Sequence, residues 1–110
     1  MINRHKQLLF ERQAQVAQAI GHPLRLAIVD FLKNGEQCVC DIAMAVGSER
    51  SNVSRHLSLM VKAGVLEHRK DGLKVIYSLK CLCIVDFFSC MGRVLKQQAK
   101  ENEKLLKAIR

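Results

Sequence analysis

Residues 40–63 constrain the fold most strongly, because they hold two short helical patterns separated by a brief break. The first pattern, at about 40–46, ends at Gly47, a residue type that commonly terminates helices. The second, SNVSRHLSLMVK, follows at once, stops at Gly64, and turns Val53, Leu57 and Met60 or Val61 inward. Two short helices joined by a glycine-containing turn predict a helix-turn-helix.

The flanking segments predict a mainly α-helical chain with one β-hairpin. Apolar residues at helical spacing favour helices at 3–20 and 23–34 and a long helix from about 82 to the end. Residues 65–79 form two β-prone runs around Asp71-Gly72, which predicts a hairpin with a type I′ turn. We therefore expect the order ααααββα in a single domain of residues 1–110.

The basic charge of the chain favours a polyanionic partner. The formal net charge is +8, and residues 48–80 hold seven Lys/Arg against three Asp/Glu. For a packed basic domain, nucleic acid is a more suitable partner than a membrane surface. A basic face that only contacts solvent would also explain the charge. The chain has neither a signal peptide nor an apolar run near about twenty residues. We therefore expect a cytoplasmic protein without a membrane partner.

The second helix of the helix-turn-helix and the hairpin carry side chains suited to DNA. Asn pairs bidentately with adenine and Arg with guanine, while Ser and Lys reach phosphates. A solvated polar helix is the alternative, but the helix and the basic hairpin occur together and in this order. The predicted DNA-binding residues are Ser48, Arg50, Ser51, Asn52, Ser54, Arg55, His56, Arg69, Lys70 and Lys74.

The segments HPLRLAIVDFL, CVCDIA, SNVSRHLSLMVKAGVL and the Asp-Gly hairpin ending in VIYSL resemble the ArsR/SmtB family of winged-helix repressors. The resemblance implies a homodimer that binds an imperfect palindrome of double-stranded operator DNA and represses until an inducer weakens its hold. It implies dimerisation helices at 1–21 and 82–110, a helix-turn-helix at 38–63 and a wing at 64–80. Where the family commonly has a capping Ser or Thr, this chain has Glu49, so we expect Ser48 to cap the recognition helix.

Cys38 and Cys40 stand at the start of the first helix of the helix-turn-helix. Two residues apart, cysteines diverge inside a helix but can share one ion in an extended first turn. CVCD resembles the family motif for arsenite and for cadmium or lead, whereas burial of one cysteine in the core is the structural alternative. Those relatives use a further cysteine, and this chain has Ala43 and Met44 at the later positions.

Cys81 and Cys83 form a second Cys-x-Cys, between the wing and the last helix. In zinc-sensing members of the family, these positions resemble those of an aspartate and a histidine, whose partners from the other subunit would here be Val94 and Gln97. Thiolates favour thiophilic ions over zinc. The expected inducer is arsenite, Cd²⁺ or Pb²⁺, with Zn²⁺ and Cu⁺ as further options, and no organic cofactor is expected.

Cys90 lies seven residues after Cys83, about 10 Å along a helix, which is too far to share an ion. We expect it to pack at the dimer interface beside Phe88, with ligation through local unwinding as the alternative. Five cysteines also allow a repressor that responds to oxidants, sulfide or persulfide. The family's persulfide-sensing branch pairs two cysteines at positions that here hold Asp30 and Leu95-Lys96, so that specific site is missing. A thiol oxidoreductase or metal carrier would leave the helix-turn-helix unexplained, so we do not expect an enzyme.

Overall fold

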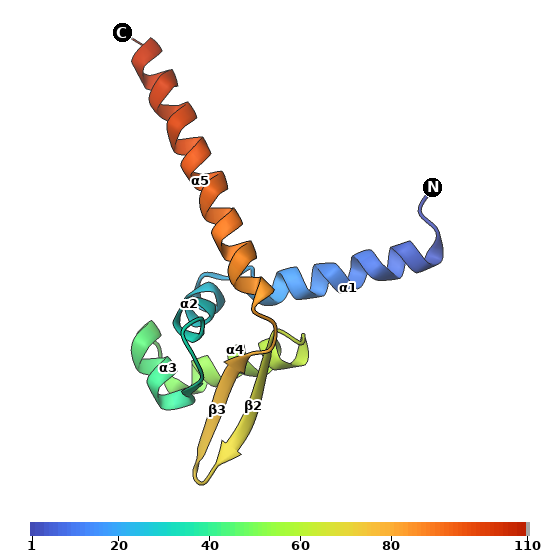
Figure 1. Ribbon diagram of the computed structural model, residues 1–110, viewed down its shortest axis with the longest axis vertical. Coiled ribbons are helices and arrows are strands. Elements are labelled where there is room, and N and C mark those ends of the chain that lie inside the picture. Colours follow the sequence, from blue (N-terminus) through green and yellow to red (C-terminus); the bar gives the residue numbers. More distant parts are fainter. Residues whose placement is uncertain (110) are drawn as a thin grey trace.

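A computed structural model describes residues 1–109 and shows a winged-helix body from which two helices project (Figure 1). The order of the longer elements is the predicted ααααββα, and a two-residue strand before the third helix is an addition. The elements are α1 (Arg4–Ile20), α2 (Pro23–Leu32), β1 (Gln37–Cys38), α3 (Val39–Val46), α4 (Arg50–Lys62), β2 (Leu66–Asp71), β3 (Lys74–Leu79) and α5 (Cys83–Ala108).

Local signals explain one end of each of the first three helices. The side chain of Asn3 caps α1 by accepting a hydrogen bond of 2.8 Å from a backbone N–H of the first turn. Pro23 opens α2, and Nδ1 of His22 accepts from the N–H of Leu24 at 3.1 Å. Gly47 ends α3 with φ at 69°, a left-handed conformation that favours glycine.

The start of α4 differs from the prediction. Glu49 is the residue that precedes the first helical turn, and it makes no side-chain capping bond. The hydroxyl of Ser48 accepts a hydrogen bond of 3.0 Å from Nδ2 of Asn52. The expectation that Ser48 caps the helix is therefore wrong, because its oxygen serves a side chain one turn further along.

The hydrophobic core joins α2, α3, α4 and the base of the wing. Met60, and not Val61, is the fully buried residue of its turn. Removing one such side chain from water contributes about 1.5–3 kcal/mol, so the helix-turn-helix is held as one unit with α2. The largest fully buried side chains are Ile28, Val29, Ile42, Val53, Leu57, Met60, Val65 and Leu66.

The wing hairpin of β2 and β3 belongs to a three-stranded antiparallel sheet in the order β1-β3-β2. Strand β1 adds to the predicted hairpin by pairing Cys38 with Ile76. Asp71 pairs with Lys74, so Gly72 and the next residue form the turn. Gly72 has φ at 64°. Among the described residues only glycines have a positive φ, so Leu73, the second residue of the turn, does not. The type I′ prediction is therefore wrong, and glycine in the first position fits a type II′ turn.

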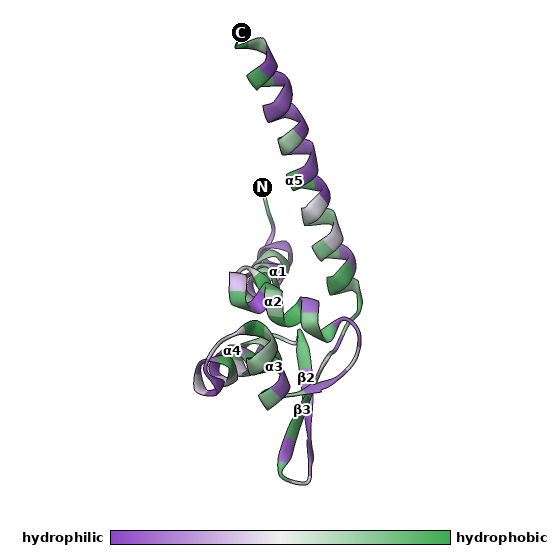
Figure 2. Cartoon of the chain, turned by 90° about the vertical axis from the view of Figure 1, so that its left-hand side faces the viewer, coloured by the Kyte–Doolittle hydropathy of each residue, from purple (hydrophilic) through white to green (hydrophobic). Residues whose placement is uncertain are grey.

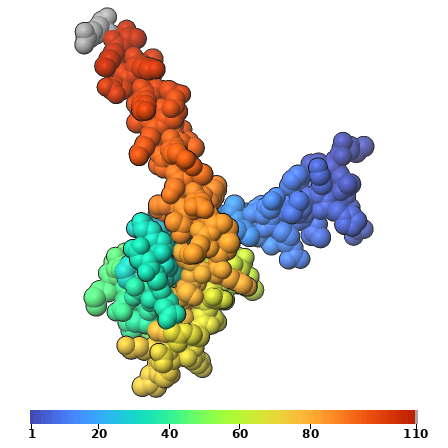
Figure 3. All heavy atoms as spheres, viewed as in Figure 1, coloured from blue at the N-terminus to red at the C-terminus, as the bar shows by residue number. Residues whose placement is uncertain are grey.

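Helices α1 and α5 project from the body as two arms that bury little of their surface (Figure 3). Only Ala19 and Ile20 of α1 are buried, and no described residue of α5 is. Apolar and polar residues mix along α5 (Figure 2). The large exposed apolar side chains of the two arms are Leu8, Leu9, Phe10, Val16, Phe87, Val94, Leu95, Leu105, Leu106 and Ile109.

Candidate DNA-binding surface and cysteine sites

Three of the predicted DNA-binding residues form one hydrogen-bonded chain along α4. Asn52 donates to the hydroxyl of Ser48 at 3.0 Å, and Nη2 of Arg55 donates to Oδ1 of Asn52 at 3.4 Å. The chain links the turn before α4 to the second turn of the helix. Such bonds restrict the rotamers of the two side chains that are chemically able to read base edges.

The other polar residues of α4 differ in accessibility. Arg50 and Ser51 are exposed, like Arg55, whereas Ser54 and His56 are half-buried. An exposed residue in the first turns of a recognition helix is free to meet a groove or a phosphate. Arg50, Ser51 and Arg55 are therefore the most accessible of the α4 residues that we predicted to bind DNA.

His56 is engaged by the protein itself. Nε of Arg25, in α2, donates to Nδ1 of His56 at 3.1 Å, and the rings of His22 and His56 lie 4.7 Å apart. Burial, followed by the positive charges of Arg25, His22 and Arg55, lowers the pKa of His56 below its usual 6.5. Sequence reasoning missed Arg25, whose position 31 residues from His56 gives no local signal.

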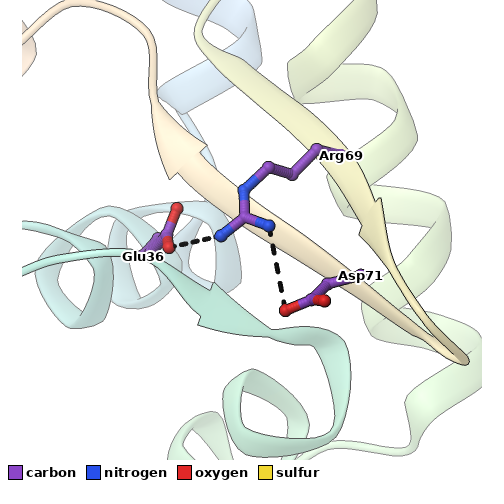
Figure 4. A network of polar contacts seen from close by, with 3 residues as sticks. All are labelled: Glu36, Arg69 and Asp71. Carbon is purple, nitrogen blue, oxygen red and sulfur yellow. Dashed lines mark hydrogen bonds and ion pairs between the residues drawn. The ribbon is translucent and has the colours of Figure 1, made fainter.

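The wing residue Arg69 is paired with two carboxylates (Figure 4). Its Nη2 donates to Glu36 at 2.6 Å, and its Nη1 lies 3.8 Å from Asp71. The hydrogen bond and the charge of Glu36, with that of Asp71, raise the pKa of Arg69. Lys70 and Lys74 are exposed and have no ion-pair partner within residues 1–109. Of the three wing residues that we predicted to bind DNA, these two lysines are therefore the ones without an ion pair.

The first Cys-x-Cys does not present two thiols together. Cys38 lies in β1, is 7% exposed, and directly precedes α3, which starts at Val39. Cys40 already lies inside α3 and is exposed. The extended first turn that would bring both sulfurs to one ion therefore includes only Cys38. The predicted ligation at this pair stays a prediction without a preformed site.

The second Cys-x-Cys does bring its thiols together. The sulfurs of Cys81 and Cys83 lie 2.6 Å apart, and both side chains are exposed. The hydrogen bond from the Cys83 thiol, together with the Cys83 backbone N–H, lowers the pKa of Cys81. The same hydrogen bond between the two thiols raises the pKa of Cys83. Leu82 between them is helical rather than extended. Cys81 therefore folds back onto the first turn of α5 instead of lying in an extended segment.

Cys90 lies on α5 and is exposed, and Nη2 of Arg93 approaches its sulfur to 3.0 Å. Within the part of the chain that the structure describes, no three His, Cys, Asp or Glu side chains gather as a metal site. The pair of Cys81 and Cys83 is the thiol cluster from which a larger ligand set could be built.

Residues 22–68 match the family described as bacterial regulatory protein, arsR family. The cadmium resistance transcriptional regulatory protein CadC homolog of Staphylococcus aureus is 36% identical over 83 residues, covering 71% of this chain and 69% of that protein. The arsenical resistance operon repressor of Escherichia coli K12 is 39% identical over 66 residues, covering 59% of this chain and 56% of that protein.

The fold also matches a solved structure closely. The homodimeric winged helix-turn-helix DNA-binding domain of Mb0332 from Mycobacterium bovis, a possible ArsR-family transcriptional regulator, superposes with a TM-score of 0.79. The two sequences are 26% identical, and the match covers 91% of this chain and 93% of that one. No helix among residues 1–109 is long and apolar enough to cross a membrane. This chain belongs to the arsR family of bacterial regulatory proteins and is a winged-helix, DNA-binding transcriptional regulator, not an enzyme.

Proposed function

We propose that this protein is a homodimeric repressor that binds an imperfect palindromic operator and releases it when a thiophilic inducer binds Cys81 and Cys83. The observation that carries the proposal is the contact of 2.6 Å between these two sulfurs at the start of α5. The preferred inducers are arsenite, Cd²⁺ and Pb²⁺, and Zn²⁺ or Cu⁺ are weaker candidates because thiolates favour soft ions. The cadmium and arsenical regulators among the relatives support this class.

The two uncovered arms, α1 and α5, support a homodimer formed through the predicted dimerisation segments 1–21 and 82–110. Helices α1 and α5 expose large apolar side chains such as Phe10 and Leu106, and an isolated protein rarely leaves such continuous surfaces in water. A hollow of about 450 Å³ between α2 and α5 is lined by Leu26, Phe88, Met91 and their neighbours. A second copy would fill it, and the Mb0332 domain is itself homodimeric. Cys90 would then lie near this interface, beside Phe88.

Operator binding rests on α4 and the wing of residues 64–80. Asn52 and Arg55, which share a hydrogen bond, would read bases, while the exposed Lys70 and Lys74 would neutralise phosphates. One recognition helix per subunit implies half-sites about 10 bp apart or a multiple of that. Asn52→Ala and Arg55→Ala should each weaken operator binding by roughly 1–3 kcal/mol, whereas Lys74→Ala should weaken operator and random DNA alike. Normal operator binding by both α4 variants would show that another face reads DNA.

The inducer would act through the junction that Cys81 and Cys83 occupy. Strand β3 ends at Leu79, the backbone N–H of Lys80 donates to the carbonyl of Val65 at 3.0 Å, and Cys83 opens α5. A thiolate-bound ion there ties the wing to the dimerisation helix and changes their relative orientation. The two recognition helices then no longer match both half-sites. The dimer would thus have two arrangements, one favoured by DNA and the other by the inducer. Further ligands would come from the other subunit or from solution.

Oxidation of the same pair is the second candidate signal. Two exposed thiols in contact, without a third protein ligand gathered among the described residues, suit disulfide formation as well as chelation. The two thiols would release two protons and two electrons as the S–S bond forms, and an oxidant such as a polysulfide would accept the electrons. The effect on the junction of wing and α5 would resemble that of an ion.

A titration of operator-bound protein distinguishes the two signals. Arsenite, Cd²⁺, Pb²⁺, Zn²⁺, Cu⁺ and polysulfide are added separately under reducing and oxidising conditions, and release is followed by fluorescence anisotropy. Release by an ion under reducing conditions supports metal or metalloid sensing, while release by polysulfide alone, reversed by dithiothreitol, supports oxidation. Release by any of these from the Cys81→Ser/Cys83→Ser variant as readily as from the wild type would contradict the proposed site.

A further inference from the structure

Arg25 connects three helices through one guanidinium group. The residue lies in α2, its Nη1 donates to the backbone carbonyl of Gln18 at 3.0 Å, and its Nε donates to Nδ1 of His56 at 3.1 Å. Gln18 lies in the last turn of α1, where the partial negative charge of the helix end favours a cation. A single planar group therefore spans the distance from α1 to the recognition helix α4.

The surroundings of Arg25 make this connection consequential. A hollow of about 340 Å³ opens between α1 and α4 and is lined by Gln15, Gln18, Arg25, Leu59 and Lys62. Side chains do not fill this space, so apolar packing alone does not set the separation of the two helices here. The two hydrogen bonds of Arg25 cross from one helix to the other beside this hollow.

The connection requires a neutral His56. Nδ1 accepts from Arg25, so the ring proton resides on Nε2, and protonation would turn both nitrogens into donors. The charged or titratable groups that face the ring are Arg25 from α2, His22 at the N-terminal cap of α2, and Arg55 from α4. Burial and these charges lower the pKa of His56, which keeps the acceptor available at neutral pH.

We propose that Arg25 and His56 are positioning residues that fix α4 relative to α1 and thereby set the half-site spacing that the dimer reads. The inference rests on DNA binding by α4 in a dimer held by α1 and α5, as proposed above, and is independent of the inducer. It also changes the role of His56, which we predicted to contact DNA and which here acts through Arg25.

Only operator binding depends on this geometry. Two recognition helices must enter two half-sites at once, so a shift of α4 against the dimerisation helix misaligns one of them. Binding to random DNA depends on phosphate neutralisation, which tolerates such a shift. Loss of the connection should therefore reduce specificity while leaving the salt dependence of binding unchanged.

The first test uses Arg25→Met, which keeps the apolar stem of the side chain but removes its donors. Arg25→Lys is the intermediate, because it keeps the charge but has one nitrogen in place of the three of the guanidinium. The probes are a duplex selected by the wild-type protein from a random-sequence library, its derivatives with one base pair inserted or deleted between half-sites, and a random duplex. Arg25→Met should weaken binding to the selected duplex about tenfold, the effect of one lost charge-assisted hydrogen bond, and should flatten the dependence on spacing. Binding to random DNA and the salt slope should stay unchanged.

The second test uses an isosteric pair at His56. Oδ1 of Asn overlies Nδ1 of His and can accept from Arg25, whereas the amide of Gln overlies Nε2 and cannot. His56→Asn should therefore bind the selected duplex like the wild type, and His56→Gln like Arg25→Met. Gln has the higher helix propensity, so helix stability works against this expectation. The pKa of His56 lies below the usual 6.5, and lowering the pH through it should weaken operator binding of the wild type more than that of His56→Asn.

The outcomes separate this inference from the proposed function. A fall of about 0.9 in the salt slope of Arg25→Met would mean that Arg25 contacts a phosphate, and it would overturn the positioning role. Equal operator affinities for His56→Asn and His56→Gln, with both variants folded by circular dichroism, would also overturn it. A wild-type protein that selects no duplex, or that is monomeric, would contradict the proposed function itself.

Discussion

The two Cys-x-Cys segments have the same spacing and similar positions, each at the start of a helix, yet the fold treats them differently. Cys38 is pulled into the core by β1, which pairs with β3, and Cys40 is left outside on α3. Neither Cys81 nor Cys83 belongs to a strand, and both are exposed. Their sulfurs lie 2.6 Å apart. The comparison teaches that the spacing of a ligand motif does not specify a site, because a single strand pairing can separate its members.

The largest expected effect is on thiol accessibility. In the native protein, iodoacetamide should modify Cys38 on the order of 1000-fold more slowly than Cys81, since exposing the buried thiol of Cys38 requires local opening of about 4 kcal/mol. Peptide-resolved mass spectrometry measures both rates in one sample. Cys40 provides the matched control from the same motif and should react quickly. Comparable rates for Cys38 and Cys81 would mean that β1 is open in solution.

A smaller effect should appear in inducer response. Cys81→Ser/Cys83→Ser should lower the apparent inducer affinity by about 100-fold or more, because even groups that only orient metal ligands contribute 10–100-fold. Cys38→Ser/Cys40→Ser, the matched double variant, should release operator DNA at the wild-type inducer concentration. Release is followed by fluorescence anisotropy. The reverse result would assign sensing to the first pair, and normal release by both would direct attention to Cys90.

Stability should separate the members of the first pair. Cys38→Ser places a hydroxyl in an apolar environment and should lower the free energy of unfolding by about 1–3 kcal/mol. Cys40→Ser changes an exposed position and should stay within about 0.5 kcal/mol of the wild type. Urea denaturation followed by circular dichroism, at one fixed protein concentration, measures both. A large loss in Cys40→Ser would mean that α3 packs differently or that Cys40 is covered in the dimer.

The smallest effect concerns the protonation of the second pair. Cys83→Ala removes the thiol that stabilises the Cys81 thiolate, so the pKa of Cys81 should rise while the backbone N–H still lowers it in part. The pH profile of Cys81 alkylation should therefore move to higher pH. Cys40→Ser/Cys90→Ser, combined with or without Cys83→Ala, provides the background for the measurement. An unchanged profile would show that the two sulfurs are apart in solution.

Much of the fold could be predicted from local sequence patterns. Apolar spacing located every long helix, and Gly47 and Gly64 marked the ends of α3 and α4 because few other residues adopt the required backbone. Part of the accessible face of α4 also followed, since Ser51 and Arg55 lie opposite the periodic apolar residues. The details of the wing turn were wrong, because strand register decides whether Asp71 or Gly72 is the first residue of the turn.

Contacts between distant residues were decided only by the tertiary structure. Strand β1 has two residues, too few for a pattern, and exists because β3 offers it a partner. Arg69 was predicted to contact DNA, and only the fold shows that Glu36, 33 residues away, pairs with it. Likewise, only the fold brings Arg25 to His56, which lies 31 residues away in the sequence. Sequence periodicity reports which side of an element is apolar, whereas the partner of a polar group depends on how the elements pack.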